Sequence, residues 1–359
     1  MNYNDIRRKS KKIKVGNLYI GGDAPVAVQS MTNVSSSDYE ALYRQMRALE
    51  EAGCDVIRMT VPDDEAVKSL YKLKCSDIKM PIVADIHFSY RLAIESAKAG
   101  ADKIRINPGN IGDESRVKAV ISACKQAGIP IRIGVNGGSL EKELLKKYGS
   151  PTPEALCESA LTHISLLEKY DFNDIIVAIK SSDVFTMKAA VKLLCQKSDY
   201  PIHLGVTEAG SERYGSIKSD AGIGGLLTDG IGDTIRVSLT ADPINEVKLG
   251  KNLIRALGID AQSHINVVSC PTCGRTKIDL ISLTNELEEK LEGIKVSRPL
   301  TVAVMGCAVN GPGEAREADI GIAGGVGEAL LFKKGEIIRK IPENEIISTL
   351  INEIKVLGN

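Results

Sequence analysis

Short apolar runs rich in β-branched residues alternate with amphipathic segments along residues 26 to 240. Parallel strands that are buried on both faces have nearly continuous apolar sequences, so we interpret each run as one such strand. The starts of successive runs lie roughly thirty residues apart, which is the length of one βα unit. The eight predicted strands are 25–32, 55–61, 81–87, 103–109, 130–137, 174–182, 201–210 and 233–240.

The segments between these runs have the periodicity of helices. Leu42, Met46 and Leu49 recur at helical spacing, and Thr152 can cap a helix whose first position is Pro153. Eight βα units over about 250 residues are typical of a closed parallel barrel, so we predict an α/β fold of the (β/α)8 TIM type. The alternative is an open doubly wound sheet. That fold more often carries a glycine-rich phosphate fingerprint after its first strand, and none follows 25–32.

Two further regions flank the predicted barrel. The stretch "KIKVGNLYIGG" (12–22) predicts a hairpin that turns at Gly16-Asn17 and covers the bottom of the barrel. After the last strand, a helix leads into the polar joint "IDAQSH" (259–264). Beyond it, strand-like segments and two helices predict a smaller α+β domain. We expect the barrel to occupy residues 1–262 and the second domain residues 263–359.

The composition narrows the classes of function. The chain has 359 residues, no net charge, no tryptophan and few other aromatic residues. A neutral protein has no long-range field toward nucleic acid or an anionic membrane, and few aromatic side chains are available to stack on bases. The polar start and the lack of a long apolar stretch predict a cytoplasmic protein with no membrane segment. In that compartment we expect free thiols rather than structural disulfides.

Polar side chains interrupt the predicted strands near their carboxyl ends, where barrel enzymes place their chemistry. Many share the parity that faces the barrel interior. Asp85 and Glu208 could pair with some of the cations, yet four arginines and one lysine exceed two carboxylates. Because burying an unpaired charge is costly, we predict that an anion, a phosphorylated or diphosphate substrate, supplies the missing counter-charge. The residues are Arg58, Thr60, Asp85, His87, Arg105, Asn107, Arg132, Asn136, Lys180, Thr207, Glu208, Arg236 and Ser238.

Three cysteines stand apart from the other five. Cys270 and Cys273 lie in "SCPTCGRTK" and Cys307 lies in "GCAVNGPGE", among glycine and proline residues that form turns. The scattered thiols are expected to be small buried side chains; they are Cys54, Cys75, Cys124, Cys157 and Cys195. Soft thiolates close together favour zinc or an iron–sulfur cluster.

The residues alone leave the identity of this centre open. His264 could complete a Cys3His zinc site, whereas a redox dithiol would leave Cys307 without a role. Three thiolates and the weaker oxygen ligand Glu314 would suit an iron–sulfur cube with one distinct iron, able to bind a substrate oxygen.

Taken together, these motifs resemble those of the bacterial hydroxymethylbutenyl diphosphate synthase family. The resemblance extends over nearly the whole chain and includes "VQSMTN", "RMTVP", "ADIHF", "RINPGNIG", "RIGVNGGSL", "LGVTEAG", "TIRVSLT", "SCPTCGRTK" and "VMGCAVNGPGEA". It implies a [4Fe-4S] cluster on Cys270, Cys273, Cys307 and Glu314. It also implies reductive ring opening and dehydration of a methylerythritol cyclodiphosphate in isoprenoid biosynthesis, with electrons from flavodoxin or ferredoxin.

The resemblance also implies roles for the polar side chains. Asn136 and His87 would lie near the diphosphate, and Glu208 would contact the hydroxyl region of the substrate and assist protonation. The residues that would hold the diphosphate are Arg58, Arg105, Asn107, Arg132, Lys180, Arg236 and Ser238.

The order of the elements raises a geometric problem. The helix after strand eight runs back to the bottom of the barrel, so the second domain begins at the end away from the polar rim. A domain of about 95 residues has a radius of gyration near 12 Å, which makes reaching the rim of the same barrel difficult. We therefore expect a head-to-tail homodimer. Two alternative functions remain: a non-catalytic iron–sulfur carrier, and a barrel phosphate enzyme with a structural zinc module.

Overall fold

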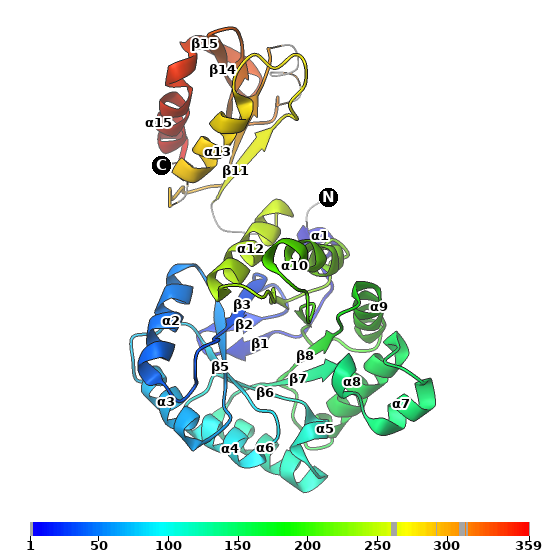
Figure 1. Cartoon of the computed structure of the whole chain (residues 1–359). Coiled ribbons are helices and arrows are strands. Elements are labelled where there is room, and N and C mark those ends of the chain that lie inside the picture. Colours follow the sequence, from blue (N-terminus) through cyan, green and yellow to red (C-terminus); the bar gives the residue numbers. More distant parts are fainter. Residues whose placement is uncertain (1–2, 260–263, 292, 309–312, 314, 359) are drawn as a thin grey trace. The chain divides into compact units, whose positions relative to one another are not determined.

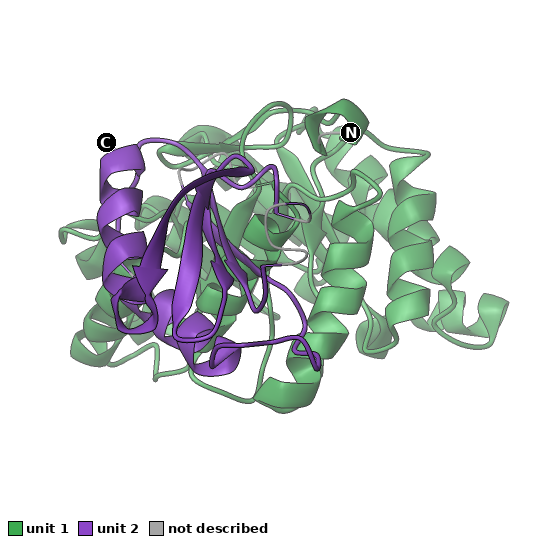
Figure 2. Ribbon diagram, turned by 90° about the horizontal axis from the view of Figure 1, so that it is seen from above, with its two compact units in different colours: residues 1–259 green, residues 260–359 purple. Residues whose placement is uncertain are grey.

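The computed structural model divides the chain into two compact units, residues 1–259 and 260–359 (Figure 2). It describes residues 3–259, 264–291, 293–308, 313 and 315–358. The boundary expected between residues 262 and 263 lies outside these ranges. Each unit has its own apolar core: the largest cluster of buried side chains belongs to the first unit, and two smaller clusters belong to the second.

Eight parallel strands form the centre of the first unit, in the order β8-β7-β6-β5-β4-β3-β10-β9. A parallel bridge between Val177 and Ile202 joins β8 to the start of β9 and closes the ring. The predicted TIM-type barrel is therefore confirmed. The strands are β3 (Ala27–Met31), β4 (Val56–Thr60), β5 (Ile82–Asp85), β6 (Lys103–Ile106), β7 (Ile131–Asn136), β8 (Ile175–Lys180), β9 (His203–Leu204) and β10 (Thr234–Ile235).

Helices surround these strands (Figure 1). Most begin at a side chain that accepts a hydrogen bond from the first turn, such as Asp38, Asp63 or Thr152. Leu42, Met46 and Leu49 are fully buried on one face, as their spacing predicts. The helices are α2 (Tyr39–Glu51), α3 (Asp64–Lys74), α4 (Tyr90–Lys98), α5 (Pro108–Ile111), α6 (Glu114–Ala127), α7 (Lys142–Tyr148), α8 (Pro153–Glu168), α9 (Val184–Cys195), α10 (Glu212–Ser219), α11 (Gly225–Leu227) and α12 (Pro243–Ala256). A π-helical turn, Asp220–Gly224, joins α10 to α11, and a short 3-10 turn, Gly137–Ser139, precedes α7.

Two strands are much shorter than predicted. The runs 201–210 and 233–240 contribute only the two-residue strands β9 and β10. Glu208 and Gly210 have φ values of 51° and 109°, which a regular strand cannot contain. The chain beyond β9 is therefore a loop, although Arg236 N still donates to Leu204 O at 2.9 Å.

The amino-terminal segment closes one end of the barrel. After the short helix α1 (Tyr3–Ile6), β1 (Ile13–Val15) and β2 (Leu18–Ile20) form an antiparallel hairpin. Ile13, Val15 and Ile20 pack against Ile176 of β8. Gly16 has a φ of 56° and lies close to Asp102 and Pro81, which precede β6 and β5. The hairpin therefore covers the amino-terminal ends of the strands, as predicted.

The second unit has a five-stranded sheet in the order β11-β12-β13-β14-β15. The first three strands are parallel, and the last two pair antiparallel. Leu287 of one helix and Leu350 and Ile354 of the other share a buried cluster with the sheet. The predicted α+β fold is confirmed. Its elements are β11 (Ile265–Ser269), α13 (Leu280–Leu291), β12 (Leu300–Met305), β13 (Ile320–Gly324), β14 (Glu328–Lys333), β15 (Glu336–Pro342), a 3-10 turn (Glu343–Glu345) and α15 (Ile346–Gly358).

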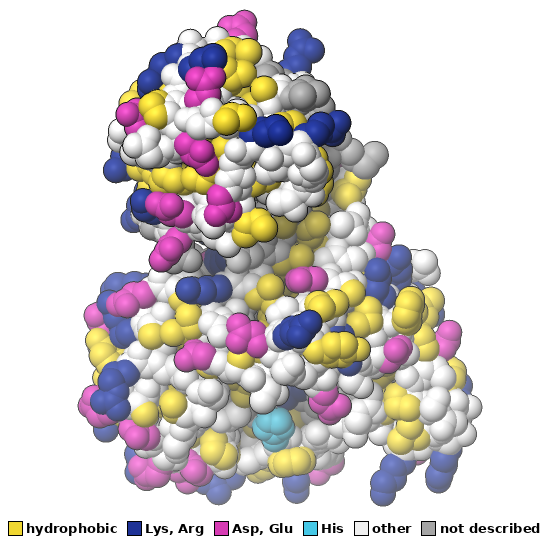
Figure 3. Space-filling model, turned by 45° about the horizontal axis from the view of Figure 1, so that its top comes forward, with side chains coloured by type: hydrophobic (Ala, Val, Ile, Leu, Met, Phe, Trp, Pro, Cys, Tyr) yellow, Lys and Arg dark blue, Asp and Glu magenta, His cyan; other side chains and the backbone are white. Residues whose placement is uncertain are grey.

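Charge is mixed on the molecular surface. On the face of each unit shown in Figure 3, basic and acidic side chains are interspersed, with no extended area of one sign. Among the described residues, none of the helices has both the length and the apolar character needed to cross a bilayer.

Candidate active site in the barrel and thiol centre in the second unit

Alternate side chains of the barrel strands point inward, and the polar ones among them surround one cavity of about 220 Å³. The strand register aligns them: Thr60 pairs with Asp85, Arg105 pairs with Arg132, and Asn136 pairs with Lys180. Thr60, Asp85, Asn136 and Lys180 are the last residues of their strands, whereas Arg132 is the second residue of β7. The cavity therefore reaches into the barrel from the end where barrel enzymes bind substrates. Its lining is Met31, Arg58, Asp85, His87, Arg105, Arg132, Gly134, Asn136, Ala178, Lys180, Thr207 and Arg236.

Asp85 is the central acidic group of this cavity. Its Oδ1 atom lies 2.9 Å from Arg105 Nη1, and its Oδ2 atom lies 3.4 Å from Arg58 Nε and 3.8 Å from His87 Nε2. Burial alone would raise the pKa of this carboxyl, but Arg58 and Arg105 outweigh that effect and lower the pKa to about 2. Asp85 is therefore an ionised counter-charge that holds two of the predicted arginines in place.

A second counter-charge comes from a residue that the sequence analysis missed. Glu246, on α12, lies 3.6 Å from Arg236 Nη2 and also accepts a hydrogen bond from Leu239 N at 2.9 Å. Glu208, the other expected carboxylate, is exposed and does not line the cavity. Glu246 follows the capping residue Asp242 in the first turn of a helix, a position where an acidic residue is ordinary. Its sequence context therefore carries no sign of this role.

The cavity retains more positive than negative charge. Arg132 is 1% exposed, and its Nε and Nη1 atoms have no hydrogen-bond partner among the described residues. Lys180 is also buried; desolvation and the surrounding arginines lower its pKa well below the ordinary value. Four arginines and one lysine thus face Asp85 and Glu246. Desolvated cations with donors to spare form a site for a strongly anionic ligand.

Four predicted residues lie outside the lining of the cavity. Thr60 Oγ1 lies 2.9 Å from Ser36 Oγ. Asn107 is buried and caps α5, with its Oδ1 accepting from Gly109 N at 3.1 Å. The Oγ of Ser238 is buried and has no partner among the described residues. Glu208 is exposed, and its φ of 51° lies in the left-handed region.

Beneath the cavity lies another polar layer that the sequence analysis did not identify. Lys103 and His203 are fully buried on the interior parity, and Gln29 is 1% exposed. Lys103 Nζ, His203 Nε2 and both amide atoms of Gln29 lack a hydrogen-bond partner within the described part of the chain. His203 Nδ1 lies 2.7 Å from Thr234 Oγ1. Lys103 stands two residues before Arg105, so the alternation that identified Arg105 could also have identified it.

The three clustered thiols of the second unit follow two neighbouring strands. Cys270 follows β11 and Cys307 lies just beyond β12, and the register pairs Ser269 with Val304. Gly306 N lies 3.3 Å from Cys270 Sγ, which places that sulfur beside the residue preceding Cys307. The strand ends therefore bring these two segments together.

Cys273 lies on a turn that is tied to the same place. Its carbonyl accepts from Thr276 N at 3.0 Å, and Lys277 N donates to Gly306 O at 2.9 Å. Hydrogen bonding from the backbone of Arg275 is the main cause that lowers the pKa of the Cys273 thiol. Glu314, the fourth predicted ligand, lies outside the described residues. Among the residues that are described, no group of three or more His, Cys, Asp or Glu side chains forms a metal site.

The thiols present fit an iron–sulfur cluster, and the place of His264 argues against a zinc site that it completes. Thiolates on glycine-containing turns, with a backbone N–H directed at one sulfur, are donors that iron–sulfur clusters use, as zinc does. His264 precedes β11, whereas Cys270 follows it. Five strand residues span about 17 Å, so His264 begins at the opposite end of the strand from the thiols.

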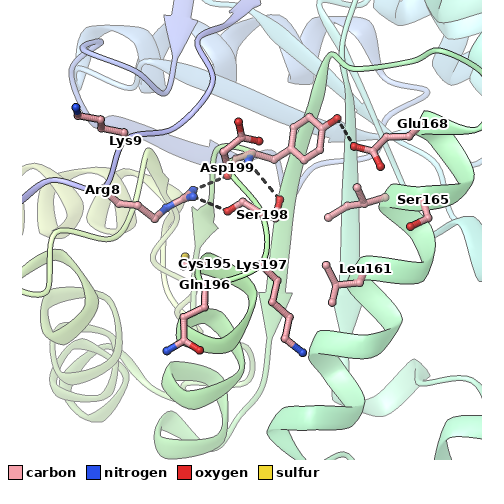
Figure 4. A pocket seen from close by; sticks show the side chains of 12 residues that line it. Arg8, Lys9, Leu161, Ser165, Glu168, Cys195, Gln196, Lys197, Ser198 and Asp199 are labelled. Carbon is pink, nitrogen blue, oxygen red and sulfur yellow. Dashed lines mark hydrogen bonds between the residues drawn. The ribbon is translucent and has the colours of Figure 1, made fainter.

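A larger hollow of about 540 Å³ lies elsewhere on the first unit (Figure 4). It is formed by α8, the end of α9 and the amino-terminal segment. Arg8 uses two of its nitrogens there to donate to the carbonyls of Ser198 and Tyr200, and Tyr200 Oη donates to Glu168 at 2.9 Å. The loop 196–202 leads into β9, so this hollow is near the amino-terminal ends of the strands. None of the predicted site residues lines it.

Two family models match the chain, one over each of its two units. A family described as the GcpE TIM-barrel domain matches residues 10–251, and one described as the GcpE protein C-terminal domain matches residues 266–356. A protein of Ruminiclostridium cellulolyticum named 4-hydroxy-3-methylbut-2-en-1-yl diphosphate synthase (flavodoxin) is 55% identical over 97% of this chain and 98% of its own. A protein of the same name from Caldanaerobacter subterraneus is 56% identical over 98% of each chain.

A solved structure also shares the fold of the barrel. The type I 3-dehydroquinate dehydratase of Clostridium difficile superposes with a TM-score of 0.51 and 16% identity, covering 69% of this chain and 98% of that one. At this level of identity the likeness concerns the fold alone.

Proposed function

The chain belongs to the GcpE family, and we propose that it forms 4-hydroxy-3-methylbut-2-en-1-yl diphosphate, the compound for which its relatives are named. The proposed substrate is 2-C-methyl-D-erythritol 2,4-cyclodiphosphate, and the reaction belongs to the non-mevalonate route of isoprenoid biosynthesis. The observation that carries the proposal is a cavity lined by surplus buried cations, in a chain that also holds Cys270 beside the residue before Cys307. A protein with this function would work in the cytoplasm.

The barrel cavity is the proposed diphosphate site. Within the described part of the chain, Arg132 Nε and Nη1 have no hydrogen-bond partner, so these donors are available to phosphate oxygens. Desolvation and the neighbouring arginines lower the pKa of the buried Lys180, an effect that a bound phosphate would oppose. Arg58, Arg105 and Arg236 are already oriented by Asp85 and Glu246. Pre-oriented cations in a water-poor site can stabilise the phosphate oxygen that departs when the ring opens. Asn107, Asn136 and Ser238 are proposed further contacts, and His87 lies at the cavity.

The thiol centre is the proposed source of electrons to the substrate. Cys270, Cys273 and Cys307, with Glu314, would hold a [4Fe-4S] cluster. When bound, such a cluster supplies single electrons that cleave a carbon–oxygen bond. The overall step consumes two electrons and two protons: the ring C–O bond to phosphate breaks, and the C3 hydroxyl leaves as water. Glu208 is the proposed group that assists protonation.

The proposed electron donor is flavodoxin, which the names of the relatives print, or a ferredoxin. We further propose a head-to-tail homodimer. The chain leaves the first unit at the end of α12, which runs away from the cavity end of the barrel. The thiol centre of one chain would then serve the barrel of its partner.

Purification without oxygen tests the proposed function. We expect brown protein with about four irons and four sulfides per chain that converts the cyclodiphosphate when a reductant is supplied. Brown protein that binds but never converts the cyclodiphosphate would instead indicate an iron–sulfur carrier. Colourless protein with one zinc would indicate a barrel enzyme with a structural zinc module.

A further inference from the structure

A carboxylate, an imidazole and a hydroxyl meet behind the loops of the barrel cavity, and the proposed reaction uses none of them. Glu141 Oε1 lies 2.7 Å from His163 Nε2 and accepts a hydrogen bond from Ser159 Oγ at 2.9 Å. His163 and Ser159 are four residues apart on α8, so they share one face of that helix. Both are buried, while the Glu141 side chain is 31% exposed.

This cluster contacts the loop that carries Asn107. A β carbon placed on Gly109 would lie 3.4 Å from Glu141 Oε1 and 3.6 Å from His163 Cε1, so the first turn of α5 rests against the pair. Gly109 N in turn donates to Asn107 Oδ1 at 3.1 Å. The orientation of Asn107 is therefore coupled to the position of Glu141.

The loop after β7 joins the same network. Asn107 Nδ2 lies 3.5 Å from Ser139 Oγ, and Ser139 Oγ lies 3.5 Å from Asn136 O. Glu141 follows two residues later, at the start of α7. The two loops that follow β6 and β7 are thus both supported by Glu141, which contacts residues of α8.

The free-energy cost of burying these polar groups indicates that they have a role beyond packing. Glu141 Oε2 is buried and has no hydrogen-bond partner among the described residues, and His163 Nε2, although 2.7 Å from Glu141 Oε1, does not have the geometry of a hydrogen bond. Burial raises the pKa of Glu141, but the adjacent His163 and the hydrogen bonds from Ser159 and the backbone outweigh burial and lower it. Apolar side chains would fill the same space with a smaller desolvation cost.

We propose that Glu141, held by His163 and Ser159, is a positioning residue that fixes the loops of Asn107 and Asn136 for the diphosphate. The inference rests on the proposed function, because it assigns the ligand of those loops. Glu141 itself does not touch the substrate. It limits the freedom of the α5 turn, so that Asn107 and the adjacent backbone N–H groups need no reordering when the ligand binds.

The test compares Glu141→Ala, Glu141→Gln and His163→Gln with Glu158→Gln in the full, cluster-loaded chain. Glu158 precedes Ser159 on α8 and binds Lys147 and Tyr148 at 2.7–2.8 Å, at the end of α7 opposite to Glu141. We expect Glu141→Ala to raise KM for the cyclodiphosphate about tenfold, with kcat and iron content nearly unchanged, because ground-state positioning is lost. Glu141→Gln, which still accepts from Ser159, should recover part of this loss.

Failure of the positioning role can be distinguished from failure of the proposed reaction. A folded Glu141→Ala variant with the KM of the Glu158→Gln control would overturn the positioning role even if the wild type is fully active. If the wild type does not convert the cyclodiphosphate, the proposed function fails, and titration with inorganic diphosphate decides the positioning role alone. Equal affinity of the wild type and Glu141→Ala for that probe would reject it, and weaker binding by Glu141→Ala would support it.

The double variant Glu141→Ala/His163→Gln should have the same KM as Glu141→Ala, because the two residues act as one unit.

Discussion

Asp85 is the residue on which the order of the arginine cavity depends. It is buried between Arg58 and Arg105, so its removal would leave two cations without their partner. We expect Asp85→Asn to lower the free energy of unfolding by about 3–5 kcal/mol, the cost of breaking a buried ion pair. Chemical denaturation of the wild type and the variant measures this difference, and equal stability would contradict the assignment.

The same residue predicts how stability depends on pH. The pKa of Asp85 is about 2 in the folded chain and about 3.8 ordinarily, so the folded state favours the ionised form. The resulting contribution, about 2 kcal/mol, is present above pH 5 and is lost as the pH falls from about 4 to 2. Denaturation across this window should show a slope that Asp85→Asn lacks.

Lys103 is a buried amine whose Nζ has no hydrogen-bond partner among the described residues, so its replacement is predicted to stabilise the fold rather than to destabilise it. Desolvation lowers its pKa well below the ordinary 10.5, so folding disfavours the protonated amine. We expect Lys103→Met to raise the free energy of unfolding by about 1–3 kcal/mol near neutral pH. The gain should shrink as the pH rises toward 10.5, where the unfolded amine also loses its proton. A destabilised variant would show that Lys103 has a counter-charge in solution.

At the scale of elements, the ends of β11 and β12 define the thiol centre. His264 lies before β11 and the thiols lie after it, so the histidine is at the wrong end to be a ligand. We expect His264→Ala to keep the iron content of the wild type, and Cys307→Ser to lose most of it. Iron analysis and absorption spectra of anaerobic protein measure both. Loss of iron or zinc in His264→Ala would restore the alternative of a Cys3His site.

Element periodicity explains both the success and the failure of the sequence analysis. A period of two places Arg58, Arg105 and Arg132 on one inward face, because strand alternation depends only on local geometry. Glu246 was missed because its helix folds back onto β3, a contact that no local pattern records. Glu208 was expected at the cavity, but its φ of 51° turns the chain out of the strand, and no residue type announces that conformation.

At the scale of the whole molecule, the cavity and the thiol centre belong to separate units of one chain. If chains pair head to tail, an intact barrel and an intact thiol centre can come from different chains. We therefore expect Arg132→Met and Cys307→Ser proteins to be inactive alone, and co-expressed mixed dimers of the two to recover activity. Mixed dimers that remain inactive, although each variant is folded, would indicate that a single chain provides the whole site.

A measurement of cyclodiphosphate binding is the most direct test of the central claim. The claim is that the surplus cations that line the barrel cavity bind an anionic substrate. Calorimetric titration should be made with anaerobic wild type, Arg132→Met and the control Arg116→Met, whose arginine is exposed on α6 beside Asp113. We predict that Arg132→Met binds about 10- to 100-fold more weakly, as expected for the loss of charge-assisted hydrogen bonds worth roughly 1.5–3 kcal/mol, while the control binds like the wild type. Equal affinity of Arg132→Met and the wild type would contradict the account.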